Sequence, residues 1–311
     1  NDFYRKRRMA SLFSALNQLS KSEYYFLECE RIAKLTQFDS AKKLASLARH
    51  KINFANFYYK SGRYKKAENI YLDLINSSLF ESVSDEIAMA FYENLSVLYI
   101  NIGATEKASF YLKQFFNERD GQLKGRDLIA YKANMSTIHT REKDHNRSKE
   151  LLLEALDIFI QSNMNNEEIA AKLYSNLTEV CLELGSVSEA RAYIDKTTSL
   201  KKISQKTFRY TKLVFAQVEI AEGNYEAAAS NLDLYLQNLN DKESSDFKRL
   251  RFVLDALIEL NVKTGNTTKA KDYCNELADL TIKEVVGIYS YLPSDLREKY
   301  LERIVYDYIL V

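Results

Sequence analysis

The sequence predicts an all-α protein, a solenoid built from repeated helical hairpins. The first observation is the scarcity of residues that break helices: 311 residues contain one proline and eight glycines. Average usage would supply roughly 15 prolines and about 20 glycines. Because β-sandwiches and barrels use both residues in their turns, the composition disfavours those classes. The second observation is that five of the eight glycines recur at related intervals of 41, 82, 38 and 42 residues.

Each of these glycines ends a long amphipathic run and precedes a shorter one. They are Gly62, Gly103, Gly185, Gly223 and Gly265. Glycine closes a helix readily because the left-handed conformation costs it nothing. An alanine five residues later lets a second helix pack close to the first. The pattern predicts long first helices, for example over 39–61, 84–102, 165–184 and 244–264.

Two further hairpins lack the glycine. The interval of 82 contains a degenerate copy in which Lys143 replaces the glycine and Ser148 the alanine. Counting back one further repeat length from Gly62 predicts a first turn near Ser20. The chain is therefore expected to hold about seven hairpins, which must stack because one pair of helices cannot bury its own apolar face.

These units resemble tetratricopeptide repeats. The best copy runs Asn53-Phe54-Ala55, Tyr58, Gly62, Tyr64, Ala67, Tyr71, in the family's small–aromatic–Gly–aromatic–Ala–aromatic order. The resemblance covers roughly residues 1–285, with a period nearer 40 than the family's usual value of about 34. It implies a right-handed superhelical array that is not catalytic and holds a protein or an extended peptide in its concave groove.

An asparagine recurs nine residues before the turn in four successive first helices. These residues are Asn53, Asn94, Asn134 and Asn176, and Val214 and Ala256 end the series. Asparagine is a poor residue for a helix interior, so the recurrence needs a cause. In one interpretation each amide bonds to the next hairpin and fixes the stacking. In the other the amides bind the backbone of a peptide, since an amide both donates and accepts.

The family resemblance adds further residues to this predicted groove. They are Asn56, Tyr59, Asn101, Arg141 and Glu179.

The composition and motifs favour binding over chemistry. The net charge is +1 and no apolar run is long enough to cross a bilayer, so neither nucleic acid nor a membrane is an expected partner. The sequence has no phosphate-binding loop and no metal-ligand spacing, so we expect no enzyme activity, cofactor or metal. Cysteines far apart in sequence fit a cytoplasmic protein, and Cys274 is predicted to lie in the core. The basic run 5–8 is interpreted as a solvated helix end.

The pattern changes after the last repeat, so we predict a repeat array over 1–286 and a C-terminal element over 287–311. Tyr289-x-Tyr291-Leu292 and Arg297-Glu298-Lys299-Tyr300 resemble the stretch that joins tetratricopeptide repeats to the caspase-like CHAT protease domain of many bacterial proteins. An ordinary capping helix that begins at Pro293 is the alternative.

Two regulatory functions stand beside the plain scaffold. If the C-terminal resemblance holds, the chain is the sensor arm of a linked protease of bacterial defence. It is then a piece of a longer protein, which its first residue, Asn1, also suggests. The other alternative is a signalling-peptide receptor that controls a transcription regulator.

Overall fold

The structure is a computed structural model, and it describes residues 2–16, 18–36, 40–81, 83–118, 123–237, 247–289, 292, 294–299 and 301. Within these residues all regular structure is helical, which confirms the predicted all-α solenoid class. The chain divides into two compact units. The N-terminal unit comprises Asn1–Gly121 with Val286–Val311, and the C-terminal unit comprises Gln122–Val285.

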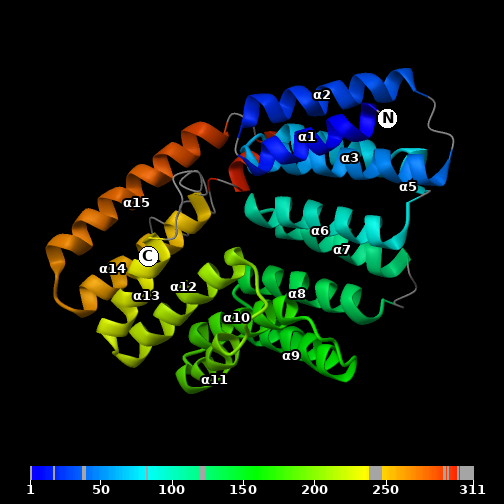
Figure 1. Cartoon of the computed structure of the whole chain (residues 1–311). Helices are drawn as coiled ribbons and strands as arrows, with labels where there is room; N and C mark the ends of the chain where they lie inside the picture. Colours follow the sequence, from blue (N-terminus) through cyan, green and yellow to red (C-terminus); the bar gives the residue numbers. More distant parts are fainter. Residues whose placement is uncertain are drawn as a thin grey trace. The chain divides into compact units, whose positions relative to one another are not determined.

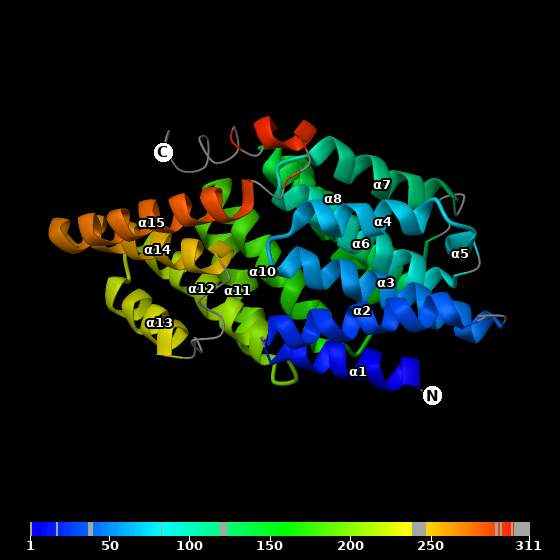
Figure 2. The same cartoon turned by 90° about the horizontal axis from the view of Figure 1, so that it is seen from above.

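The N-terminal unit contains three hairpins. They are α1 (Asp2–Ala15) with α2 (Leu19–Leu35), α3 (Ala41–Lys60) with α4 (Tyr64–Ile75), and α6 (Asp85–Asn101) with α7 (Thr105–Glu118). A short helix that the sequence did not predict, α5 (Ser78–Glu81), precedes the third hairpin. Successive hairpins stack, because α3 contacts both α1 and α2, and α6 contacts both α3 and α4 (Figures 1 and 2).

Four hairpins make up the C-terminal unit. They are α8 (Gly125–Arg141) with α9 (His145–Gln161), α10 (Glu167–Glu183) with α11 (Val187–Thr198), α12 (Gln205–Glu222) with α13 (Tyr225–Gln237), and α14 (Phe247–Lys263) with α15 (Thr267–Ile288). Here too a first helix contacts both helices of the hairpin before it, as α12 does with α10 and α11. The four first helices given above from the sequence begin and end within three residues of the observed ones.

Left-handed residues close six of the predicted turns, whereas the turn expected near Ser20 lies earlier in the chain, because α2 already begins at Leu19. Gly62, Gly103, Gly185, Gly223 and Gly265 all have φ between 69° and 83°. The next N–H in the chain bonds back to the helix, as in the 2.8 Å bond from Ser186 N to Cys181 O, and this closes the last helical turn. Lys143 takes the same conformation with φ 63°, and Asp144 N bonds to His139 O at 2.9 Å. The degenerate copy therefore folds as a complete turn.

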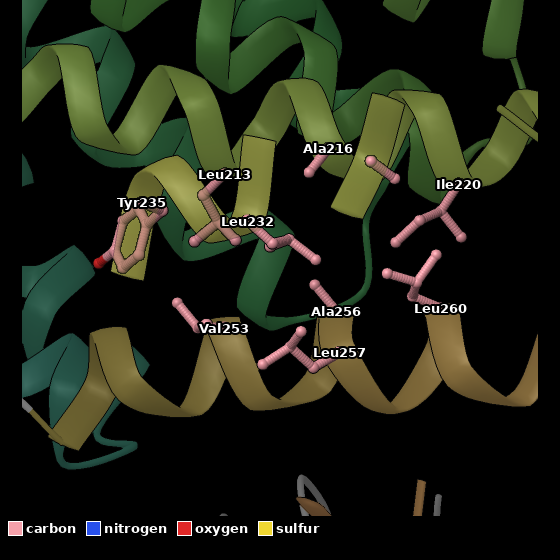
Figure 3. Close-up of a cluster of buried hydrophobic side chains, with 10 residues drawn as sticks. Leu213, Ala216, Ile220, Leu232, Tyr235, Val253, Ala256, Leu257 and Leu260 are labelled. Atoms are coloured by element: carbon pink, nitrogen blue, oxygen red, sulfur yellow. The ribbon is translucent and has the colours of Figure 1, made fainter. Parts of the chain in front are cut away.

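Apolar side chains from neighbouring hairpins form the core. Figure 3 shows one cluster in the C-terminal unit, in which Leu213 and Ile220 of α12 face Val253 and Leu260 of α14. Tyr235 of α13 closes one end of this cluster. Each such side chain contributes about 1.5–3 kcal/mol on burial. Burial between neighbouring hairpins therefore contributes to stability together with burial inside each hairpin.

The described part of the C-terminal element packs within the N-terminal unit. Leu292 and Leu296 are buried, and Ser294–Leu296 forms a 3-10 turn. Asp295 pairs with Lys107 at 2.6 Å, and Lys299 pairs with Glu106 at 2.7 Å, so the element contacts the first turn of α7. Residues 293, 300 and 302–311 lie outside the described residues, so the predicted capping helix and the division at 286 stay predictions.

Candidate functional site

The orientation of the predicted asparagines follows from a small-residue contact inside each hairpin. A small residue on the first helix packs against another small residue 12 positions later, on the second helix. Ser22 Oγ donates to Ala10 O at 2.9 Å, Ser96 Oγ donates to Ala108 O at 3.4 Å, and the hydroxyls of Ser136 and Ser148 lie 2.8 Å apart. All of these residues are buried.

Each asparagine precedes its small residue by two positions. Asn94 precedes Ser96 and Asn134 precedes Ser136, for example. Two residues correspond to about 200° around an α-helix. The amides therefore leave the first helix on the side away from its own second helix. We call this side of the first helices the ladder face.

The amides on the ladder face make few bonds within the protein. Asn53 is exposed, and Asn94, Asn134 and Asn176 are half-buried. Asn94 Nδ2 donates to Ala90 O, one turn back in its own helix, at 2.6 Å. Within the described part of the chain, the side chains of Asn53, Asn134 and Asn176 form no hydrogen bond. At these three positions, therefore, no hydrogen bond from the asparagine side chain links neighbouring hairpins within the described residues.

Two of the other predicted groove residues join neighbouring first helices of the N-terminal unit. Asn101 Nδ2 on α6 donates to the hydroxyl of Tyr59 on α3. Asn56 is bound differently, because its amide oxygen accepts a 2.5 Å bond from Tyr71 of α4. Asn56 thus tethers α3 to its own second helix, and this oxygen is already engaged by an internal donor.

The remaining predicted residues lie in the C-terminal unit. Glu179 on α10 accepts a hydrogen bond from Tyr210 on α12. Burial raises the pKa of the Tyr210 hydroxyl well above its usual value, and the Glu179 carboxylate raises it further. Arg141 is half-buried in the last turn of α8. The amide series ends after α10, because Val214 and Ala256 are buried at the same position.

The nine predicted residues thus form two sets. Asn53, Asn56, Tyr59, Asn94 and Asn101 belong to the N-terminal unit, and Asn134, Arg141, Asn176 and Glu179 belong to the C-terminal unit.

The ladder position of the first hairpin, which the sequence analysis missed, is occupied by Arg8. The contact of Ser22 with Ala10 sets the register of α1 against α2, and Arg8 precedes Ala10 by two residues. Because this hairpin lacks the turn glycine, the sequence pattern did not align it. The pair of small residues 12 apart is the signal that identifies the position.

The described residues contain no group of three or more His, Cys, Asp or Glu side chains that could hold a metal ion. None of their helices is long and apolar enough to cross a membrane. Cys29 and Cys181 are buried, and burial raises the pKa of Cys29 to about 12. The prediction that Cys274 lies in the core is wrong: this thiol is exposed. Its neighbours Asp272 and Asn275 on α15 are exposed as well.

Comparison with solved structures identifies proteins with a similar fold. The chain is similar to NprR in complex with its cognate peptide NprX, with 14% identity over 97% of this chain and 86% of that one, and a TM-score of 0.64. The Rap protein complexed with Competence and Sporulation Factor matches 98% of this chain and 97% of its own, with 14% identity and a TM-score of 0.56. BtubC from P. vanneervenii matches 71% of this chain and 89% of its own, with 18% identity and a TM-score of 0.55.

No protein-family model matches the chain, and none of the curated proteins does. The likeness to solved structures supports the tetratricopeptide-like fold of the repeats. It does not bear on the resemblance of the C-terminal element to the stretch before a CHAT domain. That resemblance stays a prediction, and two of its residues, Tyr291 and Tyr300, lie outside the described part of the chain.

Proposed function

We propose that this protein binds an extended segment of another protein, or a free peptide, along the ladder face, and that it works by binding. The observation that carries the proposal is the set of ladder amides that have no hydrogen bond within the described residues, at Asn53, Asn134 and Asn176. They recur at one position of the first helices in both units, so each of them presents the same donor and acceptor on its helix.

The chemistry of an amide suits this ligand. Every peptide unit carries one N–H donor and one C=O acceptor, and both need partners when water is removed. An asparagine amide offers a complementary donor and acceptor from one side chain. A row of asparagines therefore recognises backbone rather than side chains, and binds a peptide in an extended conformation, whose backbone groups are free.

The energetics favour the same function. Asparagine in a helix interior costs up to about 0.7 kcal/mol relative to alanine. At Asn94 the bond to Ala90 O offsets part of this cost. At Asn134 and Asn176 no bond within the described residues offsets it, so stability gives no reason for an asparagine there. Binding of a ligand gives one.

The similarity to a peptide-bound structure supports the proposal. NprR was solved in complex with its cognate peptide, and this chain shares its fold over most of both lengths. A fold of this kind therefore accommodates a peptide.

The test is a selection of short random peptides displayed on phage against the full chain, followed by calorimetric titration of the selected peptides. Two double variants, Asn53→Ala with Asn94→Ala and Asn134→Ala with Asn176→Ala, address the two units separately. Asn231→Ala is the matched control, because Asn231 is a helical asparagine on a second helix, bonded to Ala227 O in its own turn.

We expect at least one double variant to weaken binding about 10- to 100-fold, as the loss of two to four hydrogen bonds implies. Its melting temperature should stay the same or rise, since alanine is the better helix former. The proposal is wrong if no peptide is selected, or if both double variants bind as tightly as Asn231→Ala.

A further inference from the structure

The basic run at the start of α1 has an electrostatic consequence for the ladder face. Two of its four cations, Lys6 and Arg7, have partly buried partners within the protein, and Arg5 has an exposed one. Arg5 pairs with Asp2 at 2.9 Å, and Lys6 pairs with Glu28 at 2.9 Å. Arg7 Nη1 donates to both the carbonyl and the hydroxyl of Ser46, at 3.1 and 3.0 Å, and so fixes α1 against α3.

Arg8 differs from its neighbours. It is exposed, and within the described residues its guanidinium forms no hydrogen bond and no ion pair. It also occupies the ladder position of the first hairpin, where the next three hairpins carry Asn53, Asn94 and Asn134. In place of an asparagine, the first hairpin therefore carries an arginine, whose side chain is permanently charged and has five N–H donors.

A second cation lies on the ladder face of α3, the first helix of the next hairpin, which contacts α1. Arg49 precedes Asn53 by one helical turn on α3, and both side chains are exposed. The pKa of Arg7 is lowered chiefly by burial, with Tyr4 opposing and the charges of Arg49 and Arg8 adding to the decrease. Arg7 directly precedes Arg8 and bonds to Ser46, three residues before Arg49, so both cations belong to the region where α1 packs on α3.

Little negative charge balances this region. Glu86 contacts Arg49 at 3.3 Å, but its side chain is 78% exposed, and exposed pairs of this kind contribute little. The other carboxylates of the first hairpin are engaged with other partners: Glu23 with Arg63, Glu28 with Lys6 and Glu30 with Lys51. An anionic group of a ligand would find two guanidinium groups that are not neutralised by buried carboxylates.

We propose that Arg8 and Arg49 bind a carboxylate of the peptide held on the ladder face, and that this pair fixes the position of one end of the ligand. The proposal rests on the proposed function, because the carboxylate belongs to the peptide whose backbone the asparagines bind. An arginine guanidinium matches a carboxylate with two parallel N–H···O bonds, which supplies both affinity and direction.

The spacing limits where this carboxylate sits in the ligand. Packed helices lie about 8–10 Å apart, and an extended chain advances about 3.3 Å per residue. The carboxylate should therefore lie about three residues from the peptide unit bound by Asn53. It is either an Asp or Glu side chain or the carboxyl terminus of a peptide that ends there.

The experiment uses the full chain and a synthetic array of short peptides that are random except at one fixed position. Each position is fixed in turn as Glu or Gln, and each set is made with a free and with an amidated carboxyl terminus. Binding to the array is compared for the wild-type chain and for Arg8→Gln, Arg8→Lys and Arg5→Gln. Arg5 is the matched control, an exposed arginine of α1 that already has a partner in Asp2.

We expect the wild-type chain to prefer a carboxylate at one position by about tenfold, and Arg8→Gln to lose that preference while it still binds the neutral peptides. Arg8→Lys should keep part of it, and Arg5→Gln all of it. If preference follows the Glu sets, the carboxylate is a side chain; if it follows the free termini, it is the chain end.

Two failures are distinguishable. Binding of peptides with no preference for a carboxylate, or a preference that survives in Arg8→Gln, overturns the role of Arg8 and leaves the proposed function standing. No binding of any peptide by the wild-type chain overturns both. Because Arg8 is exposed, we expect Arg8→Gln to melt at the wild-type temperature, which keeps the comparison free of unfolding.

Discussion

The hydroxyl of Tyr99 donates a 2.8 Å hydrogen bond to the carboxylate of Glu68, and this bond joins α6 to α4 across two hairpins. Only 1% of Tyr99 and 6% of Glu68 are exposed. Burial raises the pKa of Glu68, while the bond from Tyr99 and the charge of Lys107, 4.0 Å away, lower it. The stacking of the second and third hairpins thus includes a polar contact inside an apolar core.

Tyr99→Phe should therefore destabilise the protein measurably. It removes the donor and leaves a buried carboxyl group without its partner, at a cost of about 1.5–3 kcal/mol. A thermal melt of the full chain measures the loss. Tyr24→Phe is the control, because 57% of Tyr24 is exposed, and it should melt like the wild type. Equal melting temperatures for the two variants would show that the Tyr99 bond contributes nothing.

A second prediction concerns pH and the buried His50. Its ring packs beside the stacked pair Phe26 and Phe54, and Nε2 donates to Glu30 Oε1 at 2.8 Å. Burial lowers the pKa of His50 despite the neighbouring Glu30. Burial would raise the pKa of Glu30, but the bonds from His50 and Lys51 outweigh it and hold the pKa at about 2.

Both pKa values are lowered in the folded chain, so both groups make it less stable as the pH falls. The unfolded chain binds protons more readily than the folded one, at a pKa of about 6.5 for His50 and of about 4.3 for Glu30. Stability should therefore fall as the pH drops below about 6.5, and fall further between about 4.5 and 2. Denaturant unfolding at a series of pH values measures this. His50→Gln should flatten the curve between pH 7 and 5, and a wild-type curve that rises on acidification would contradict the assignment.

A third prediction concerns the turn between α8 and α9. Lys143 has φ 63°, where the corresponding turns carry glycine. A side chain in the left-handed conformation costs about 1–2 kcal/mol. Lys143→Gly should therefore raise the melting temperature. Gly185→Ala should lower it through backbone strain alone, because no atom lies within 4 Å of the added methyl group. The same direction of change in both variants would contradict the role of φ.

The hairpins could be predicted from the sequence because their turns have a strict local requirement. A left-handed residue followed by a small one is recognisable in the sequence, as at Gly185 and Ala190. The pattern can still be recognised at Lys143, where the glycine is lost. The first hairpin was placed near Ser20 by period alone. Its register, and with it the position of Arg8, required the contact between Ser22 and Ala10.

The partners of the candidate site could not be predicted in this way. Asn56 and Asn101 stood together in the predicted groove, yet one bonds Tyr71 within its hairpin and the other bonds Tyr59 of the hairpin before. Which partner an amide selects depends on side-chain rotamers and on the approach of helices 15 to 42 residues away in sequence. Periodicity carries no information on either. Cys274 was misplaced for a related reason, because helical spacing does not tell which side of α15 another helix covers.

The most direct test of the central claim observes the ladder amides themselves. The side-chain Nδ2 signals of Asn53, Asn134 and Asn176 are followed by NMR, with assignment by single substitution, while a peptide selected on the full chain is added. We predict that at least two of the three shift with the same binding constant that calorimetry gives, while the signal of Asn231 stays fixed. Saturation of the protein with peptide while all three amide signals remain unmoved would contradict the account.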